Sequence, residues 1–161
     1  MMSSQINMRK ERGLVAVEFA LLIIPMLVMV FGITEFGRAM YQYNTLVKAT
    51  RDAVRYLTTQ APGSGDSTAQ CLAVYGNKTC GVAGAELVPG LTTAMVTICD
   101  ASSCPATNSS VATGAGVVNL VTVTIQGYQF QSLVSFTIGG LSVGLPNVTF
   151  GAVSTTMRQV L

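Results

Sequence analysis

One acidic residue, Glu18, interrupts an otherwise apolar stretch near the start of the chain. From Leu14 to Ile33 the sequence contains no other charged residue. A charge at the centre of a membrane-spanning helix costs roughly 2.5–3.5 kcal/mol on insertion scales, so a carboxylate in such a segment is a functional hypothesis. The alternative is a carboxylate that reaches water, because Glu18 lies only about one turn from the end of the apolar run.

The four cysteines are the second group of residues with possible chemistry: Cys71, Cys80, Cys99 and Cys104. An even number of cysteines in an oxidising compartment predicts two disulfides. We prefer Cys71–Cys80 with Cys99–Cys104, because "CDASSC" closes around a short polar turn. The pairing Cys71–Cys104 with Cys80–Cys99 stays open, as do buried free thiols. A zinc site is disfavoured, because no C-x-x-C pair is present and the spacings are unequal.

Composition argues against an enzyme. The chain of 161 residues contains no His, which removes the commonest general base and metal ligand. No nucleophile and base stand together in a recognisable motif, so we assign no catalytic residue, no metal site and no cofactor. The net charge of +2 is too small to indicate a nucleic-acid partner.

The apolar stretch is long enough to cross a bilayer. Its twenty residues, Leu14–Ile33, extend about 30 Å as a helix, which matches the hydrocarbon core of a membrane. Arg9, Lys10 and Arg12 precede it, and the positive-inside rule places that end in the cytoplasm. A cleaved secretory signal is the rival interpretation, but its apolar region is shorter and ends at an Ala-x-Ala-like site.

The helical pattern continues beyond the predicted span to about Thr59, and Pro25 is expected to kink the helix. A stripe at steps of three and four predicts its buried face: Phe36, Met40, Tyr43, Val47, Thr50, Val54 and Leu57. Gln42 is expected on the solvated face. The turn-rich "APGSGDS", residues 61–67, ends the helix.

The second half of the chain shows the two-residue period of β-strands. "AMVTIC" and "NLVTVTIQ" are predicted strands, with Val121, Val123 and Ile125 on one face of the latter. "NVTFGAVSTTM" is a weaker third strand with Val148, Phe150 and Ala152 on one face, and a short helix is expected between Ser67 and Gly76. Three short strands need a cover, so we expect an α+β fold in which the long N-terminal helix packs on a small antiparallel sheet.

The segment "RGLVAVEFA", followed by "EFGR", joins a basic leader, a glycine, a glutamate and an apolar span in a fixed order. Residues 12–57 resemble the N-terminal region of the TadE-like family, pseudopilins of the tight-adherence (Flp pilus) pathway. The resemblance implies a pilin-like fold and cleavage between Gly13 and Leu14 by a prepilin peptidase. It also implies that Glu18 meets the freed amine of a neighbouring subunit's Leu14.

The resulting organisation has four parts: a basic cytoplasmic leader (1–13), a transmembrane helix (14–37), an amphipathic periplasmic extension (38–60) and a disulfide-containing periplasmic domain (61–161). The expected location is the bacterial inner membrane, with a single pass and a cytoplasmic N-terminus. The resemblance implies as partners the prepilin peptidase, other pilin or pseudopilin subunits and the pilus assembly machinery. The alternative function is a single-pass, membrane-anchored periplasmic or surface binding module.

Overall fold

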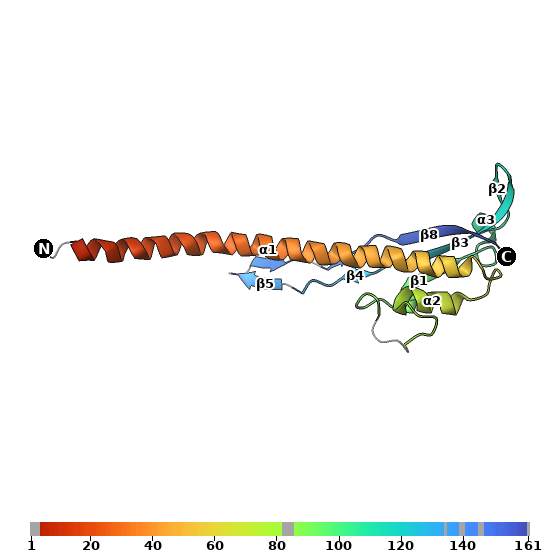
Figure 1. The fold of residues 1–161 in the computed structure, drawn as a ribbon, viewed down its shortest axis with the longest axis horizontal. Helices are drawn as coiled ribbons and strands as arrows, with labels where there is room; N and C mark the ends of the chain where they lie inside the picture. Colours follow the sequence, from red (N-terminus) through yellow and green to blue (C-terminus); the bar gives the residue numbers. More distant parts are fainter. Residues whose placement is uncertain (1–3, 82–85, 134, 139–140, 145–146, 161) are drawn as a thin grey trace. The chain divides into compact units, whose positions relative to one another are not determined.

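The computed structural model describes residues 4–81, 86–133, 135–138, 141–144 and 147–160. A long helix precedes short helices and small antiparallel sheets, which confirms the expected α+β fold (Figure 1). The helical elements are α1 (Ser4–Leu57), α2 (Asp66–Tyr75), η1 (Thr93–Met95) and α3 (Pro105–Asn108). The strands are β1 (Val96–Cys99), β2 (Val111–Thr113), β3 (Gly116–Ile125), β4 (Gln129–Phe130), β5 (Ser135–Ile138), β6 (Leu141–Gly144), β7 (Val148–Thr149) and β8 (Val153–Gln159).

The chain forms two compact units. The first contains Met1–Arg38 and Ser132–Pro146, and the second contains Ala39–Gln131 and Asn147–Leu161. The second unit therefore combines the outer part of α1 with the main sheet.

The helix α1 passes through Pro25 and ends at Leu57, close to its expected end. After it the chain enters the predicted glycine-containing turn, where Gly63 and Gly65 have φ angles of 77° and 83°. These are left-handed conformations that glycine adopts without steric cost. The turn leads directly into α2, for which Gly65 is the N-cap and Gly76 the C-cap.

Strand β3 is the centre of the four-stranded antiparallel sheet in the second unit. It pairs in antiparallel fashion with β1, with β2 and with β8. The alternation expected in this strand is confirmed, because Val121, Val123 and Ile125 are buried. They face a core built from α1, α2 and the following loops, which contains Leu46, Ala49, Ala53, Val54, Leu57, Ala69, Ala73, Val74, Val88 and Leu91.

The predicted stripe of α1 is correct only in its outer part. Thr50, Val54 and Leu57 are buried, but Phe36 and Met40 are exposed. Tyr43 is also exposed, although its ring contacts Phe150 edge-on at a centroid distance of 5.8 Å. Gln42, expected on the solvated face, is buried instead. The buried face of α1 is thus rotated from the predicted one, because the sheet packs over small residues such as Ala49 and Ala53 rather than over the larger aromatic side chains.

The C-terminal strand prediction was also partly wrong. The segment predicted as one strand contains two, β7 and β8, and Ala152 between them is exposed. Strand β8 then continues beyond the predicted end at Met157 to Gln159. Its inward positions include the polar Thr155, whose hydroxyl lies 3.0 Å from that of Thr50 on α1. The connection between β3 and β7, for which no strand was predicted, contains β4 and a β5–β6 hairpin.

Candidate functional site

The N-terminal part of α1 carries the three residues singled out by the sequence. Gly13, Leu14 and Glu18 all lie within this helix, and residues 1–3 of the predicted leader lie outside the described residues. Leu14 and Glu18 are four residues apart, so they share one face of the helix. Leu14 is 67% exposed, and Glu18 is exposed as well.

Glu18 has no partner in the described part of the chain. No hydrogen bond or ion pair joins its carboxylate to the residues that the structure describes. The surrounding apolar side chains are exposed too, and none of the most apolar window of α1 is buried by the rest of the chain. This part of α1 is therefore a candidate membrane anchor, consistent with a single-pass protein.

Glu35, unlike Glu18, is buried and has partners within the chain. Its side chain is buried, at 4% exposure, and its Oε2 accepts a hydrogen bond of 3.1 Å from Nη2 of Arg38. The same oxygen accepts the backbone N–H of Leu133 at 3.3 Å. The sequence places Glu35 and Arg38 three residues apart, a spacing that favours this pair on a helix. It did not predict Leu133, because a backbone donor 98 residues away leaves no local signal.

The four cysteines form two disulfides, Cys71–Cys80 and Cys99–Cys104. This is the sequence-local pairing that we preferred. The first joins α2 to the loop that follows it, and the second closes the loop after β1.

Asp100 organises the loop inside the second disulfide. Its Oδ1 accepts backbone N–H groups of Ser102 and Ser103, at 2.9 and 2.8 Å, and the hydroxyl of Ser103. Its Oδ2 accepts the N–H of Gly63 from the turn after α1. Burial raises the pKa of Asp100, but these hydrogen bonds together outweigh burial and leave the pKa below its ordinary value.

Asp66 lies at the start of α2 and has the opposite shift. Burial of its carboxylate, reinforced by the negative charge of Asp100, raises its pKa. Its Oδ1 is buried and has no hydrogen-bond partner among the described residues. The fold therefore favours the charged form of Asp100 and disfavours the charged form of Asp66. Among the residues that the structure describes, no group of three His, Cys, Asp or Glu is placed to hold a metal ion.

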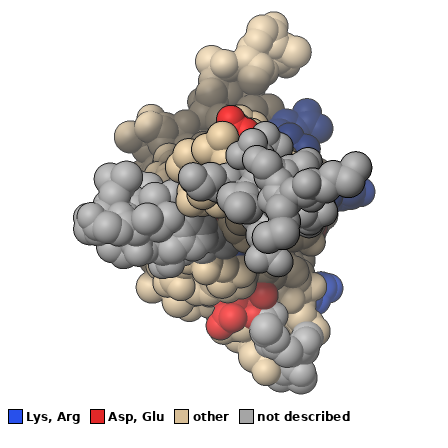
Figure 2. Space-filling view, turned by 90° about the vertical axis from the view of Figure 1, so that its left-hand side faces the viewer, with Lys and Arg blue, Asp and Glu red and all other residues tan. Residues whose placement is uncertain are grey.

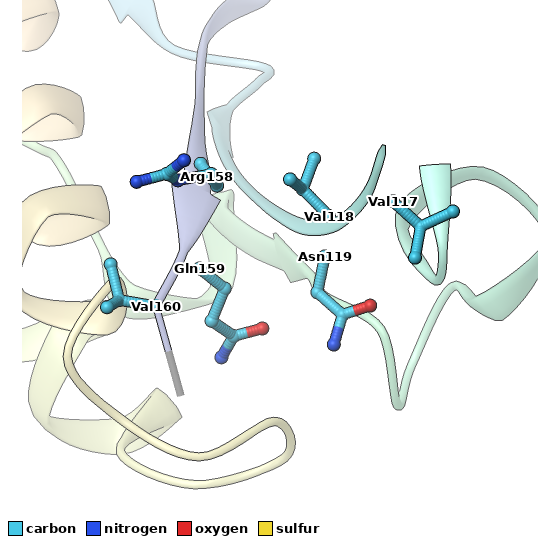
Figure 3. Close-up of a pocket in the computed structure, with 6 residues that line it drawn as sticks. All are labelled: Val117, Val118, Asn119, Arg158, Gln159 and Val160. Carbon is cyan, nitrogen blue, oxygen red and sulfur yellow. The ribbon is translucent and has the colours of Figure 1, made fainter. Parts of the chain in front are cut away.

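A shallow pocket of about 290 Å³ lies where β3 begins and β8 ends, lined by Val117, Val118, Asn119, Arg158, Gln159 and Val160 (Figure 3). The amide of Gln159 is already engaged, because its Nε2 donates to the carbonyl of Gln60 at 2.9 Å. Asn119 accepts the N–H of Ser110 through its Oδ1 at 3.0 Å. These contacts connect loops to the sheet. The described charged side chains visible in Figure 2 form small, separate basic and acidic groups among uncharged residues.

Part of α1 matches the model of a known protein family. The model of the family described as TadE-like protein matches residues 13–55, which confirms the resemblance found in the sequence. The match begins at Gly13, includes Glu18 and Glu35, and ends within the outer part of α1. No curated protein and no solved structure matches the chain.

Proposed function

We propose that this TadE-like chain is a structural, pseudopilin-like component of a tight-adherence (Flp-type) pilus. The family match supports an association with the Tad pilus, and the candidate membrane anchor supports insertion in a membrane. In the proposal the membrane is the bacterial inner membrane, with the basic leader in the cytoplasm and the disulfide-containing part outside it. A prepilin peptidase removes residues 1–13.

The observation that carries the proposal is the contrast between the two glutamates of the N-terminal part of α1. Glu35 is buried and paired within the chain, whereas Glu18 is exposed in an apolar segment with no partner among the described residues. A carboxylate in such a segment is costly unless something neutralises it. The proposal gives that task to a second subunit.

Cleavage after Gly13 creates the partner. The new α-amino group of Leu14 has an ordinary pKa of about 8, so it is mostly protonated at neutral pH. Glu18 of one subunit then pairs with the amine of its neighbour within the same apolar layer. Because a buried ion pair stabilises only when both charges meet, this contact fixes the stagger between neighbouring subunits.

The Glu18→Gln variant tests the proposal. Removing the charge makes insertion of the helix easier, so abundance and cleavage should stay normal while pilus assembly is lost. Asp52→Asn is the matched control, because Asp52 is an exposed carboxylate on the outer part of the same helix. It should assemble normally.

The three measurements, protein abundance, processing and pilus formation, separate the competing roles. A carboxylate that only reaches water predicts a silent Glu18→Gln variant. A purely structural role predicts reduced abundance. Normal pili built from fully processed Glu18→Gln protein would exclude an assembly role for this carboxylate.

A further inference from the structure

Leu133 is an apolar side chain that the fold leaves uncovered. It lies in the connection between β4 and β5 and is 77% exposed, more than any other large apolar side chain in the part of the chain that the structure describes. Similar exposures are concentrated in the predicted span of α1, for example 69% at Leu22 and 68% at Ile33. Leu133 thus has the exposure of a residue in the span, although it does not lie on α1.

The backbone of Leu133 is held against α1. Its N–H donates to Oε2 of Glu35 at 3.3 Å. The same oxygen accepts a hydrogen bond of 3.1 Å from Nη2 of Arg38, and Glu35 is buried. A buried carboxylate is costly without such donors, so the bond to Leu133 is one that the fold needs. It places Leu133 beside the Glu35 turn of the helix.

Glu35 lies where α1 changes from apolar to polar. It is the first charged residue after the apolar stretch Leu14–Ile33, and it follows Ile33 by about 3 Å along the helix axis. Arg38 comes one turn later, with its side chain 26% exposed. Charged groups avoid hydrocarbon and collect where the acyl chains meet the headgroups. In the inserted protein, this turn of α1 therefore lies at the edge of the hydrocarbon core, at the end of the span away from the basic leader.

The surface of α1 near this level is open. Ile33 and Phe36 are 68% and 63% exposed, and none of the most apolar window of α1 is buried by the rest of the chain. In a membrane, lipid is the neighbour of such side chains. Leu133 is held to the same turn of the helix and is exposed as well, so it meets the same surroundings. The contact is thus continuous with the candidate membrane anchor.

The sequence around Leu133 suits this position. No charged residue occurs between Asp100 and Arg158, so this connection can approach a membrane without burying a charge. Irregular backbone does not enter lipid-exposed hydrocarbon, because acyl chains offer no hydrogen bonds, but the headgroup layer contains water. At the boundary, an apolar side chain can reach the acyl chains while its backbone stays hydrogen-bonded. Exposure of the same side chain to water would instead be unfavourable.

We propose that, in the membrane-inserted protein, Leu133 is a second lipid contact, with its side chain at the boundary between headgroups and acyl chains beside Glu35. The partner of this contact is the lipid bilayer itself. The inference rests on the membrane insertion of α1 that is part of the proposed function, and not on the pilus role. Because the connection carries no charge, the contact does not require anionic lipid.

Tryptophan fluorescence tests this placement directly, because the chain contains no Trp. The full-length Leu133→Trp chain is reconstituted in vesicles of neutral phosphatidylcholine. Lipids that carry a spin label near the headgroup or near the end of the acyl chain report depth. Iodide, present on both sides of the vesicle membrane, reports access from water.

Val160→Trp is the matched control. Val160 is also apolar and is 68% exposed, but its N–H bonds to the carbonyl of Thr58, just beyond the end of α1. That end of the helix lies about 35 Å along its axis from Glu35. Trp itself favours membrane interfaces, and the same residue at Val160 controls for this preference. Leu22→Trp, within the predicted span, tests insertion of α1.

The proposal predicts a clear difference between these variants. Leu133→Trp should be quenched more strongly by the shallow label than by the deep one, and several-fold less by iodide than Val160→Trp. Val160→Trp should respond to iodide and to neither lipid label. Leu22→Trp should respond to the deep label.

Three results with an inserted Leu22→Trp control would overturn the proposal alone. Equal iodide access for Leu133→Trp and Val160→Trp, without lipid quenching, would place Leu133 in water. Protection of Leu133→Trp from iodide and from both lipid labels would place it against protein, such as a neighbouring subunit. Stronger quenching by the deep label would place it in hydrocarbon. A Leu22→Trp chain that the deep label does not quench would overturn the proposal together with its premise of membrane insertion.

Discussion

The phenol of Tyr128 lies 2.9 Å from Oε1 of Gln42, a buried contact between residues 86 positions apart. The hydroxyl also lies 3.1 Å from the carbonyl oxygen of Pro89. The contact joins the outer part of α1 to the segment between β3 and β4. It explains why a glutamine occupies a buried position on a helix face that otherwise contains small and apolar residues.

Tyr128→Phe should therefore destabilise the protein. The change removes, at almost constant volume, the hydroxyl that faces the buried amide oxygen of Gln42 and the carbonyl oxygen of Pro89. The expected loss is about 1–3 kcal/mol in the free energy of unfolding. Urea unfolding of the full chain in detergent measures it. Tyr41→Phe, at a position on α1 that is 71% exposed, is the matched control and should change the free energy little.

Asp100 should make stability depend on acid pH. Its pKa is lower in the folded chain than in the unfolded chain, so its contribution is complete above the ordinary pKa and is lost as the pH falls through the folded value. Asp100→Asn should reduce this loss of stability at acid pH. It should also destabilise the chain by about 1–3 kcal/mol at neutral pH, because an amide nitrogen cannot accept the N–H of Gly63. If the variant lost stability at acid pH to the same extent as the wild type, this role of Asp100 would be contradicted.

The contribution of Asp66 to stability should depend on pH in the opposite direction. Its pKa is raised in the folded chain, so the favourable contribution is present below the ordinary pKa and is lost as the pH rises through the folded value. Asp66→Asn should accordingly stabilise the chain at neutral pH and have little effect in acid. Thermal unfolding at both pH values measures the difference, and a destabilised variant at neutral pH would refute the assignment.

Both disulfides should be present in protein isolated from an oxidising compartment. Closing loops between cysteines 9 and 5 positions apart is worth about 2–3 kcal/mol each in the chain-entropy model. Alkylation of the unfolded chain without reductant should label no cysteine, and labelling after reduction should reach all four. Peptide mapping then distinguishes Cys71–Cys80 with Cys99–Cys104 from the crossed pairing.

The sequence was informative where apolar residues repeat strongly. The long helix and the buried face of β3 follow from periodicity, because Val121, Val123 and Ile125 alternate with polar residues. It was less informative where inward positions are polar. Thr155 and Gln159 of β8 face the helix side of the sheet, where Thr155 contacts Thr50 and Gln159 donates to Gln60, so the hydrophobic pattern understates this strand.

The β5–β6 hairpin shows a signal that was available but not used. Gly139 and Gly140 separate two short alternating segments, which is a recognised hairpin pattern. Its association with α1 had no such signal, because Leu133 contacts Glu35 through a backbone N–H. Similarly, the predicted stripe of α1 followed the large side chains and missed Ala49, Ala53 and Gln42, whose burial depends on the sheet.

Gly13 should be essential for processing. Gly13→Val should leave a full-length precursor in the membrane, because a branched side chain prevents the close approach of the backbone that cleavage requires. Gly37→Val is the matched control on the same helix, since a side chain there meets nothing within 4 Å. Normal cleavage of Gly13→Val would show that this glycine is not the recognised residue.

The most direct test of the proposed function is the intact mass of the wild-type chain, purified from its native membrane with its peptidase present. The proposed function predicts a mature protein that begins at Leu14 and lacks residues 1–13, with a free α-amino group to pair with Glu18 of a neighbour. A mass that retains all thirteen residues would contradict it, because the amine required for the Glu18 contact would then not exist.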